Sequence, residues 1–203
     1  GCSPAVFDLL PPLAHTLVPW AGVPADGPPV MVTRSPDFGI DGFECFVPTA
    51  LAGPLQAALT AAGAVLASSD ALEVLRIEAG RPALGIDMTD ETLAQEARLD
   101  ALDAISYTKG CYTGQEVVAR VHFRGHVNRV LRGVRAAAVP EGDVRVFAGD
   151  ADIGDVRSRA LSPRLGPIAL AMVRREVEPG TPVTLRSPSG SADATVVELP
   201  FPA

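Results

Sequence analysis

The chain has 203 residues, of which 47% are hydrophobic and 20% charged, and its formal net charge is −7. This length supports one large domain or two small ones, and the composition is that of an ordinary soluble protein. The negative charge argues against broad binding of nucleic acid through its phosphate backbone. Because the sequence has no run of 18 or more uncharged apolar residues, we expect no membrane span.

The three cysteines, Cys2, Cys45 and Cys111, lie far apart and form no C-x-x-C pair. An odd number of separated cysteines indicates a reducing compartment, so we expect a cytoplasmic protein without a disulfide framework. The sequence begins at Gly1, and no charged segment followed by an apolar one comes after it. We therefore expect no signal peptide, and we expect the chain to begin inside a longer protein.

Turn residues divide the first part of the chain into short elements. We expect a helix over 6–10 that ends at two prolines, followed by a turn-rich stretch over 20–29. Strands over 29–34 and 43–47 are separated by a cluster of turn residues at 37–42, so this segment is predicted to form a hairpin.

Helix signals dominate the next segment. Pro48 and Thr49 are predicted to begin a helix that runs to about Ala62, with Gly63 as the residue that ends it. A short strand is predicted over 65–67.

A second helix is predicted over 71–79, where Asp70 and Glu73 give an N-cap signal and Gly80 ends the periodic pattern. The charged stretch over 92–102 is also compatible with a helix.

The pattern changes after Val127, so a domain boundary is placed near Asn128. From there, five turns separate about six short runs rich in Val, Leu and Ile, a spacing typical of a small antiparallel barrel or sandwich. The turns lie at 140–142, 148–150, 163–167, 179–180 and 188–190.

The segment Lys109–Glu116, with the sequence KGCYTGQE, carries the strongest chemical signal. Thr113 and Glu116 fit a capping box, which predicts that a helix begins here and runs to about residue 125. Cys111 would then face the partly positive helix N-terminus, and Lys109 adds a cation nearby. Both features favour the thiolate, so Cys111 is a candidate reactive or ligating cysteine. The alternative is a buried cysteine that acts as a small hydrophobe, and spacing alone does not decide between the two.

Glu78 lies near the end of an otherwise apolar helix. It is either a solvated acid on the exposed face or a carboxylate that accepts paired hydrogen bonds from a flat heterocycle with adjacent N–H donors, such as a pterin.

Basic residues follow the cysteine segment. His122 and His126 have i, i+4 spacing but lack a third ligand, so they fit better as cations in a last helical turn, and no metal site is predicted. Four arginines form either a solvated face or a receptor for an acidic ligand tail or a protein partner. They are Arg120, Arg124, Arg129 and Arg132.

KGCYTGQE resembles the signature of the YgfZ family, folate-binding proteins related to the glycine-cleavage T-protein (aminomethyltransferase). Residues 71–87 are similar to the family block A-L-E-x-x-R-I-E-A-G-x-P-x-x-G-x-D, and Ala94 stands where the family usually has proline. The resemblance covers nearly the whole chain. Further similar segments lie at 42–44, 95–96, 103–116, 154–163 and 199–201.

The resemblance implies an α+β fold. An antiparallel sheet with helices, an incomplete T-protein-like folate-binding fold, would be followed by a small C-terminal antiparallel β-barrel. Residues 1–104 would form the second segment of the folate-binding domain, 105–128 the signature cysteine loop and helix, and 129–203 the barrel. The N-terminal third of the family, which in T-proteins supplies a catalytic aspartate and much of the folate pocket, would be missing ahead of Gly1.

The resemblance also assigns roles to residues. Cys111 matches the YgfZ signature cysteine and Lys109 the lysine before it, which makes them the candidates for chemistry. Glu78 matches the glutamate that holds the pterin in the T-protein relatives. Three residues that follow Cys111 are further candidates for binding folate, namely Tyr112, Gln115 and Arg120. T-proteins have an acidic residue where Cys111 stands, so the chain sides with the YgfZ branch.

The leading functional hypothesis is therefore a tetrahydrofolate-binding accessory protein that supports assembly or repair of iron–sulfur clusters and, through them, tRNA modification. Its partners would be folate and iron–sulfur client proteins, without direct binding of nucleic acid or membrane. The alternatives are an aminomethyltransferase of the glycine-cleavage type and a non-catalytic binding module.

Overall fold

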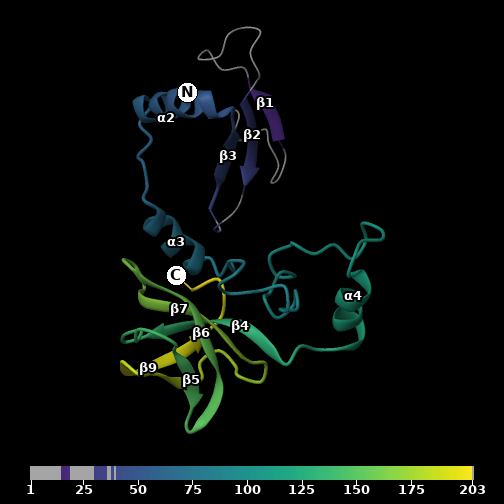
Figure 1. Ribbon diagram of the computed structural model, residues 1–203, viewed down its shortest axis with the longest axis vertical. Helices are drawn as coiled ribbons and strands as arrows, with labels where there is room; N and C mark the ends of the chain where they lie inside the picture. Colours follow the sequence, from purple (N-terminus) through teal and green to yellow (C-terminus); the bar gives the residue numbers. More distant parts are fainter. Residues whose placement is uncertain (1–14, 19–29, 36–37, 39, 203) are drawn as a thin grey trace. The chain divides into compact units, whose positions relative to one another are not determined.

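The computed structural model describes residues 15–18, 30–35, 38 and 40–202 (Figure 1). The chain divides into two compact units, residues 1–69 and 70–203, and each is considered by itself. The predicted helix over 6–10 and the turn-rich stretch over 20–29 lie outside the described residues.

The first unit contains a three-stranded antiparallel sheet of β1 (His15–Val18), β2 (Val30–Ser35) and β3 (Gly42–Phe46), in that order. The predicted hairpin is confirmed, since β2 pairs with β3 and places Val32 opposite Cys45. Val30 and Val32 are buried, as expected when alternate residues of a strand face the same side.

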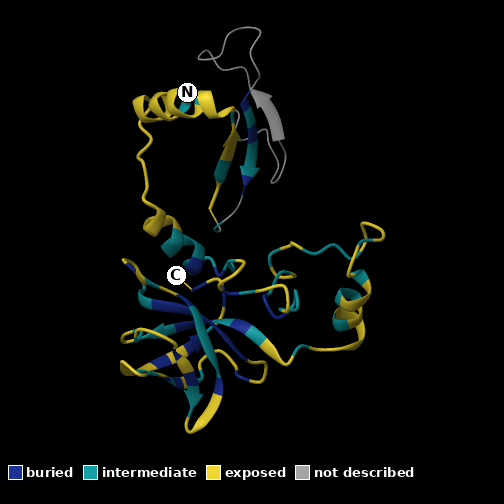
Figure 2. Cartoon of the chain, in the orientation of Figure 1, coloured by how far each residue is buried: buried dark blue, intermediate teal, exposed yellow. Residues whose placement is uncertain are grey.

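Helix α2 (Thr49–Ala61) follows the sheet, so the predicted helix is confirmed. Pro48 is its N-cap, and Gly63 has the left-handed φ of 99° that commonly follows a helix. None of its residues is buried (Figure 2). The predicted strand over 65–67 is wrong. Val65 and Leu66 are 92% and 75% exposed, and no described strand pairs with them. A short apolar run alone is therefore not enough to predict a strand.

Helix α3 (Ser69–Glu78) lies at the start of the second unit apart from its first residue, and Gly80 ends it with a φ of 67°. The predicted helix is confirmed, but its N-cap signal is wrong, because Asp70 already lies inside the first turn. No helix forms over 92–102. A series of turns takes its place, and Arg98 has a positive φ of 60°, which interrupts a right-handed helical path.

A closed barrel of six antiparallel strands forms the C-terminal part of the second unit, and it is one of the two arrangements that the turn spacing predicted. The strand order is β4-β7-β6-β5-β8-β9, and β9 pairs back with β4, so the barrel has no open edge. Its strands are β4 (Arg129–Ala136), β5 (Arg145–Ala148), β6 (Ala151–Ser162), β7 (Gly166–Arg174), β8 (Pro182–Ser187) and β9 (Gly190–Val197).

Strand β7 is buried on both faces, as the dark blue segment in Figure 2 shows. Ala169, Ala171 and Val173 belong to the core cluster that gathers residues from all six strands. The alternate residues Ile168, Leu170 and Met172 belong to a second cluster. That cluster also contains Ile77 of α3 with Leu131, Leu199 and Phe201. A strand buried on both faces has a continuous apolar sequence, and IALAMV is such a run.

The predicted fold class is therefore confirmed: an antiparallel sheet with helices, followed by a small antiparallel barrel. The division of the chain at 104 and 128 stays a prediction.

The close approach of β6 to β7 gives a testable prediction. Gly154 lies opposite Val173, and a Cβ atom at Gly154 would clash with the backbone oxygen of Met172. Because this contact is with backbone, one strand must shift, and Gly154→Ala is expected to lower the free energy of unfolding by about 3 kcal/mol. The control is Ser191→Ala, which changes an exposed residue of β9 and should cost less than about 0.5 kcal/mol. Chemical denaturation measures both, and equal stabilities would contradict the prediction.

Candidate functional site

Glu78, the last residue of α3, is held by the turn between β6 and β7. Ser162 Oγ donates a hydrogen bond of 2.5 Å to Glu78 Oε1, and Arg164 Nη2 donates one of 2.9 Å to Oε2. The Glu78 side chain is only 12% exposed. Ile77, the residue before it, is fully buried in the cluster on the outer face of β7, which fixes this end of the helix against the barrel. Glu78 is thus paired and mostly buried rather than solvated.

The Glu78 carboxylate keeps capacity for further hydrogen bonds. An ionised carboxylate has about four acceptor positions, and Ser162 and Arg164 use one on each oxygen. The Arg164 side chain is 55% exposed, so its guanidinium lies at the solvent side of the pair. The main chain of Glu78 is fixed as well, because its carbonyl oxygen accepts a 2.9 Å bond from the Phe201 N–H. The site therefore offers a carboxylate of fixed orientation.

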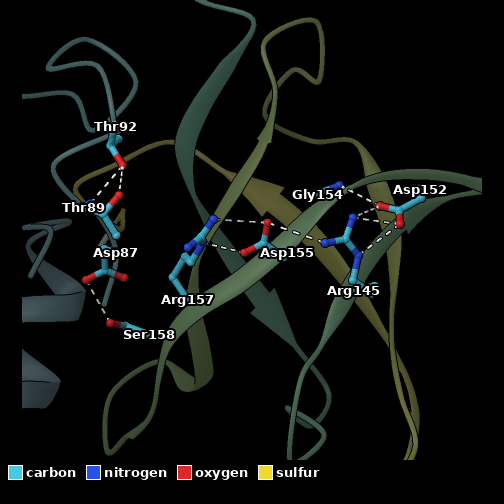
Figure 3. A network of polar contacts seen from close by, with 9 residues as sticks. All are labelled: Asp87, Thr89, Thr92, Arg145, Asp152, Gly154, Asp155, Arg157 and Ser158. Carbon is cyan, nitrogen blue, oxygen red and sulfur yellow. Dashed lines mark hydrogen bonds and ion pairs between the residues drawn. The ribbon is translucent and has the colours of Figure 1, made fainter. Parts of the chain in front are cut away.

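A buried ion pair next to Glu78 connects α3 to the barrel. Arg76 Nη1 donates to Asp87 Oδ2 at 2.8 Å, and the Asp87 side chain is completely buried. The same Asp87 oxygen accepts bonds from the Ala83 N–H and from Ser158 Oγ of β6, the latter drawn in Figure 3. Arg76 Nη2 also donates to Ser158 at 2.7 Å. These bonds join α3, the loop after it and β6 at one point.

Glu73 completes the environment of Arg76. It receives hydrogen bonds from Arg76 Nε at 2.8 Å and from Nη2 at 2.5 Å. These bonds hold the pKa of Glu73 below its usual value and raise that of Arg76. The sequence signal that could have revealed this network is the family block itself, since Glu73, Arg76 and Asp87 all belong to it.

The cysteine segment forms a loop that leads into α4 (Gln115–Arg124). Cys111 is exposed, and Gly110 beside it has a left-handed φ of 93°. Ser106 Oγ accepts hydrogen bonds from the N–H groups of Thr108 and Lys109, which organises the start of the loop. Cys111 is therefore presented at the surface.

The predicted capping box at Thr113 and Glu116 is wrong. The N-cap of α4 is Gly114, in the left-handed region with a φ of 85°, and no side chain caps the helix. Glycine adopts this conformation without the steric cost that threonine would pay, so the helix begins after Gly114. Its end is confirmed, because Gly125 is the C-cap. Cys111 consequently lies farther from the helix N-terminus than the pattern predicted.

Two aromatic contacts shape the loop. The ammonium group of Lys109 lies 4.7 Å from the centre of the Tyr112 ring, a cation–π contact. The Tyr107 ring stacks on His122 with centres 4.0 Å apart, and both rings meet Phe123 edge to face. The loop is thus packed against the last turn of α4, and His122 is part of this stack.

The turns over 93–104 connect α4 to the barrel. Gln95 Nε2 donates a 2.9 Å bond to the Val118 carbonyl oxygen of α4. The next residue, Glu96, is buried, and its carbonyl oxygen accepts a 2.8 Å bond from the Leu131 N–H of β4. Adjacent residues of one turn therefore hold the helix and the first strand of the barrel.

The structure divides the predicted site residues into two groups. Lys109, Cys111 and Tyr112 share the loop, and Gln115 and Arg120 follow on α4, where Arg120 is exposed. Glu78 belongs to the α3–barrel contact, and within the described part of the chain its side chain bonds to none of the other five. Among the described residues no group of three or more His, Cys, Asp or Glu could hold a metal ion. The assigned roles stay predictions.

Comparisons with known proteins place the chain among its relatives. Residues 129–202 match the family profile of the glycine cleavage T-protein C-terminal barrel domain. Aminomethyltransferase from Streptomyces avermitilis is 36% identical over 196 residues, which are 90% of this chain and 52% of that protein. The tRNA-modifying protein YgfZ of Serratia proteamaculans is 44% identical over 80 residues, 37% of this chain and 24% of that protein.

The chain is related to the aminomethyltransferases and to YgfZ. The predicted resemblance is thereby confirmed. The crystal structure of aminomethyltransferase T from Bartonella henselae agrees, with a TM-score of 0.73 at 26% identity over 85% of this chain and 50% of that one. The chain spans about half the length of the aminomethyltransferases it matches. No helix in the described part of the chain is both long and apolar enough to cross a membrane.

The buried ion pair predicts a large difference between two arginine variants. Arg76→Met leaves the Asp87 carboxylate buried without its cation, which is expected to lower the free energy of unfolding by about 3–5 kcal/mol. Arg145→Met is the control, because Arg145 pairs with Asp152 at the surface and is half exposed, so its loss should cost less than about 1 kcal/mol. Urea denaturation of both variants measures the difference, and similar losses would disprove the special role of the buried pair.

Glu73 predicts a dependence on pH. Its pKa in the folded protein is held below the usual 4.5 by Arg76, so its contribution to stability is complete above 4.5 and disappears as the pH falls through the folded value. Glu73→Gln should therefore flatten the decline of the unfolding free energy below about pH 5. The exposed Glu91, changed to Gln, serves as the control and should leave the wild-type slope. The observation that would refute this is an unchanged slope in Glu73→Gln.

Proposed function

We propose that this chain is part of a cytoplasmic tetrahydrofolate-binding protein of the YgfZ type. Such a protein supports assembly or repair of iron–sulfur clusters and, through them, tRNA modification. The observation that carries the proposal is Cys111 in the KGCYTGQE loop, where the T-proteins have an acidic residue. The exposure of this thiol on an organised loop supports a role in which it meets another molecule.

The surroundings of Cys111 fit thiol chemistry with a partner. Ser106 and the left-handed Gly110 fix the backbone on the approach to the thiol. Lys109 supplies a positive charge in the same loop, where its contact with the Tyr112 ring limits its mobility. In this proposal Cys111 is the reacting or ligating group, and Lys109 is the second residue of the loop that takes part in the chemistry.

Glu78 is proposed to bind the pterin ring. Its carboxylate is oriented by Ser162 and Arg164 and keeps free acceptor positions on both oxygens. Adjacent N–H donors of a pterin would fill such positions with charge-assisted hydrogen bonds. Tyr112, Gln115 and Arg120 are proposed to complete the folate site, with the exposed Arg120 facing the acidic tail of the ligand.

An aminomethyltransferase is the second candidate, because relatives of that name match most of the chain. Their alignments cover 86–98% of it, whereas those of the two YgfZ proteins cover 37–38%. The sequence difference that separates the two candidates is the cysteine at position 111. A non-catalytic binding module remains the third.

Binding of folate tests the role of Glu78. Glu78→Gln replaces one acceptor oxygen by a donor, so one pterin N–H would meet an N–H group. The loss of a hydrogen bond to a charged group, about 1.5–3 kcal/mol, should weaken tetrahydrofolate binding about tenfold to a hundredfold. Calorimetric titration of the full-length protein gives the dissociation constants, with Glu91→Gln as the control. Equal constants for Glu78→Gln and wild type would reject the assignment.

Complementation of a deletion strain distinguishes the three functions. For the YgfZ-type role, wild type should restore an iron–sulfur-dependent tRNA-modifying enzyme but not glycine cleavage, and Cys111→Ser should fail. Cys45→Ser, which changes another exposed cysteine, should still restore the enzyme. Restored glycine cleavage would favour the aminomethyltransferase. If wild type restores neither activity, the result would favour the binding module.

A further inference from the structure

Basic side chains surround a pocket where β4 begins and β7 ends. The pocket has a volume of about 370 Å³. Three of its lining residues are arginines, and one lining residue is a glutamate. With the histidine neutral, the formal charge of the lining is +2. Its lining consists of His126, Asn128, Arg129, Arg174, Arg175 and Glu176.

The strand register forces two of these charges together. Arg129 of β4 lies directly opposite Arg174 of β7 in the antiparallel pair. Residues in opposite positions project on the same face of a sheet, and like charges there destabilise the pairing. Arg175 is held at the same place, because its N–H donates a 3.0 Å bond to the Asn128 carbonyl oxygen. The backbone therefore holds three arginines at the edge of one pocket, two of them in directly opposite positions.

No carboxylate in the described part of the chain forms an ion pair with Arg129, Arg174 or Arg175. Other arginines of the barrel are paired: Arg132 binds Glu198 at 2.8 Å, and Arg145 binds Asp152 at 2.7 Å. Asp152 senses the charge of Arg174, which contributes to its lowered pKa, but the main cause is its hydrogen bonding with Arg145. Glu176 offsets one of the three positive charges of the lining, and the other two are not balanced by an ion pair within the described part of the chain.

We propose that this pocket binds a phosphate-type oxyanion, either inorganic phosphate or the phosphoryl group of a small molecule. Guanidinium groups bind such oxygens through paired hydrogen bonds, and a dianion would relieve the repulsion between Arg129 and Arg174. The volume exceeds the need of a single anion and leaves room for an organic substituent. The proposal uses none of the residues assigned to folate or to thiol chemistry, so it stands independently of the proposed function.

Calorimetry and thermal denaturation of the protein test the site. Inorganic phosphate and phenyl phosphate should each bind saturably and raise the melting temperature above that in sodium chloride of equal ionic strength. Arg129→Gln and Arg174→Gln should each weaken binding about tenfold to a hundredfold, as expected for a lost hydrogen bond to a charged group. Arg186→Gln is the matched control, since Arg186 lies on β8, which pairs with β5 and β9, and it should bind as wild type does.

Stability without phosphate separates a binding defect from misfolding. Because the substitution removes a repulsion, Arg174→Gln should melt no lower than wild type in chloride alone. If phenyl phosphate binds more tightly than inorganic phosphate, the natural ligand of the site is a larger molecule with a phosphoryl group. If inorganic phosphate binds more tightly, the ligand is the free ion. The proposal is overturned if neither compound acts beyond the chloride control, or if Arg186→Gln weakens binding as much as Arg129→Gln does.

Discussion

The burial of β7 on both faces is the constraint on which the second unit depends. One face closes the interior of the barrel, and the other forms a cluster with Ile77 and the C-terminal residues Leu199 and Phe201. An interior packed to the density of an organic crystal leaves little freedom to its parts. The strand therefore fixes the end of α3 and, with it, the direction of the Glu78 carboxylate.

The two ends of β7 serve opposite electrostatic arrangements. Where the strand begins, residues of the preceding turn satisfy a carboxylate that is mostly buried, Glu78. Where it ends, Arg174 stands opposite Arg129, and neither arginine forms an ion pair with a carboxylate of the described residues. In the first arrangement the carboxylate is paired and keeps acceptor positions for a ligand. In the second, two like charges face each other, and an external anion would balance them. One rigid strand thus supports two chemically different surfaces.

Much of the fold followed from local patterns in the sequence. Glycine and proline marked the five turns of the barrel correctly, because turns depend on backbone freedom that these residues alone provide or restrict. The pattern failed where a neighbouring residue had a stronger preference, as when Gly114 rather than Thr113 preceded α4. It failed again over 92–102. There Arg98 has a positive φ, and its side chain bonds to Glu198 and to the Leu199 carbonyl oxygen. These partners are distant in the sequence, so no local pattern could reveal them.

The candidate site was less accessible to sequence reasoning because its contacts join distant residues. Glu78 could be named from its motif, but Ser162 and Arg164 come from a turn far along the chain. The arginines after the cysteine loop looked like one basic segment. In the structure Arg132 is neutralised by Glu198, whereas Arg129 joins Arg174 and Arg175, which lie in a separate part of the sequence.

The bond between the Phe201 N–H and the Glu78 carbonyl oxygen has a consequence for synthesis of the protein. A ribosome releases α3 long before the last strand and the residues after it, and segments fold as they emerge only if their contacts are already available. The outer face of β7 and the tail that covers α3 are made late. The end of this helix therefore reaches its final position only after residue 201 has been made, and a nascent chain that stops before it lacks the bond that fixes the Glu78 carbonyl oxygen.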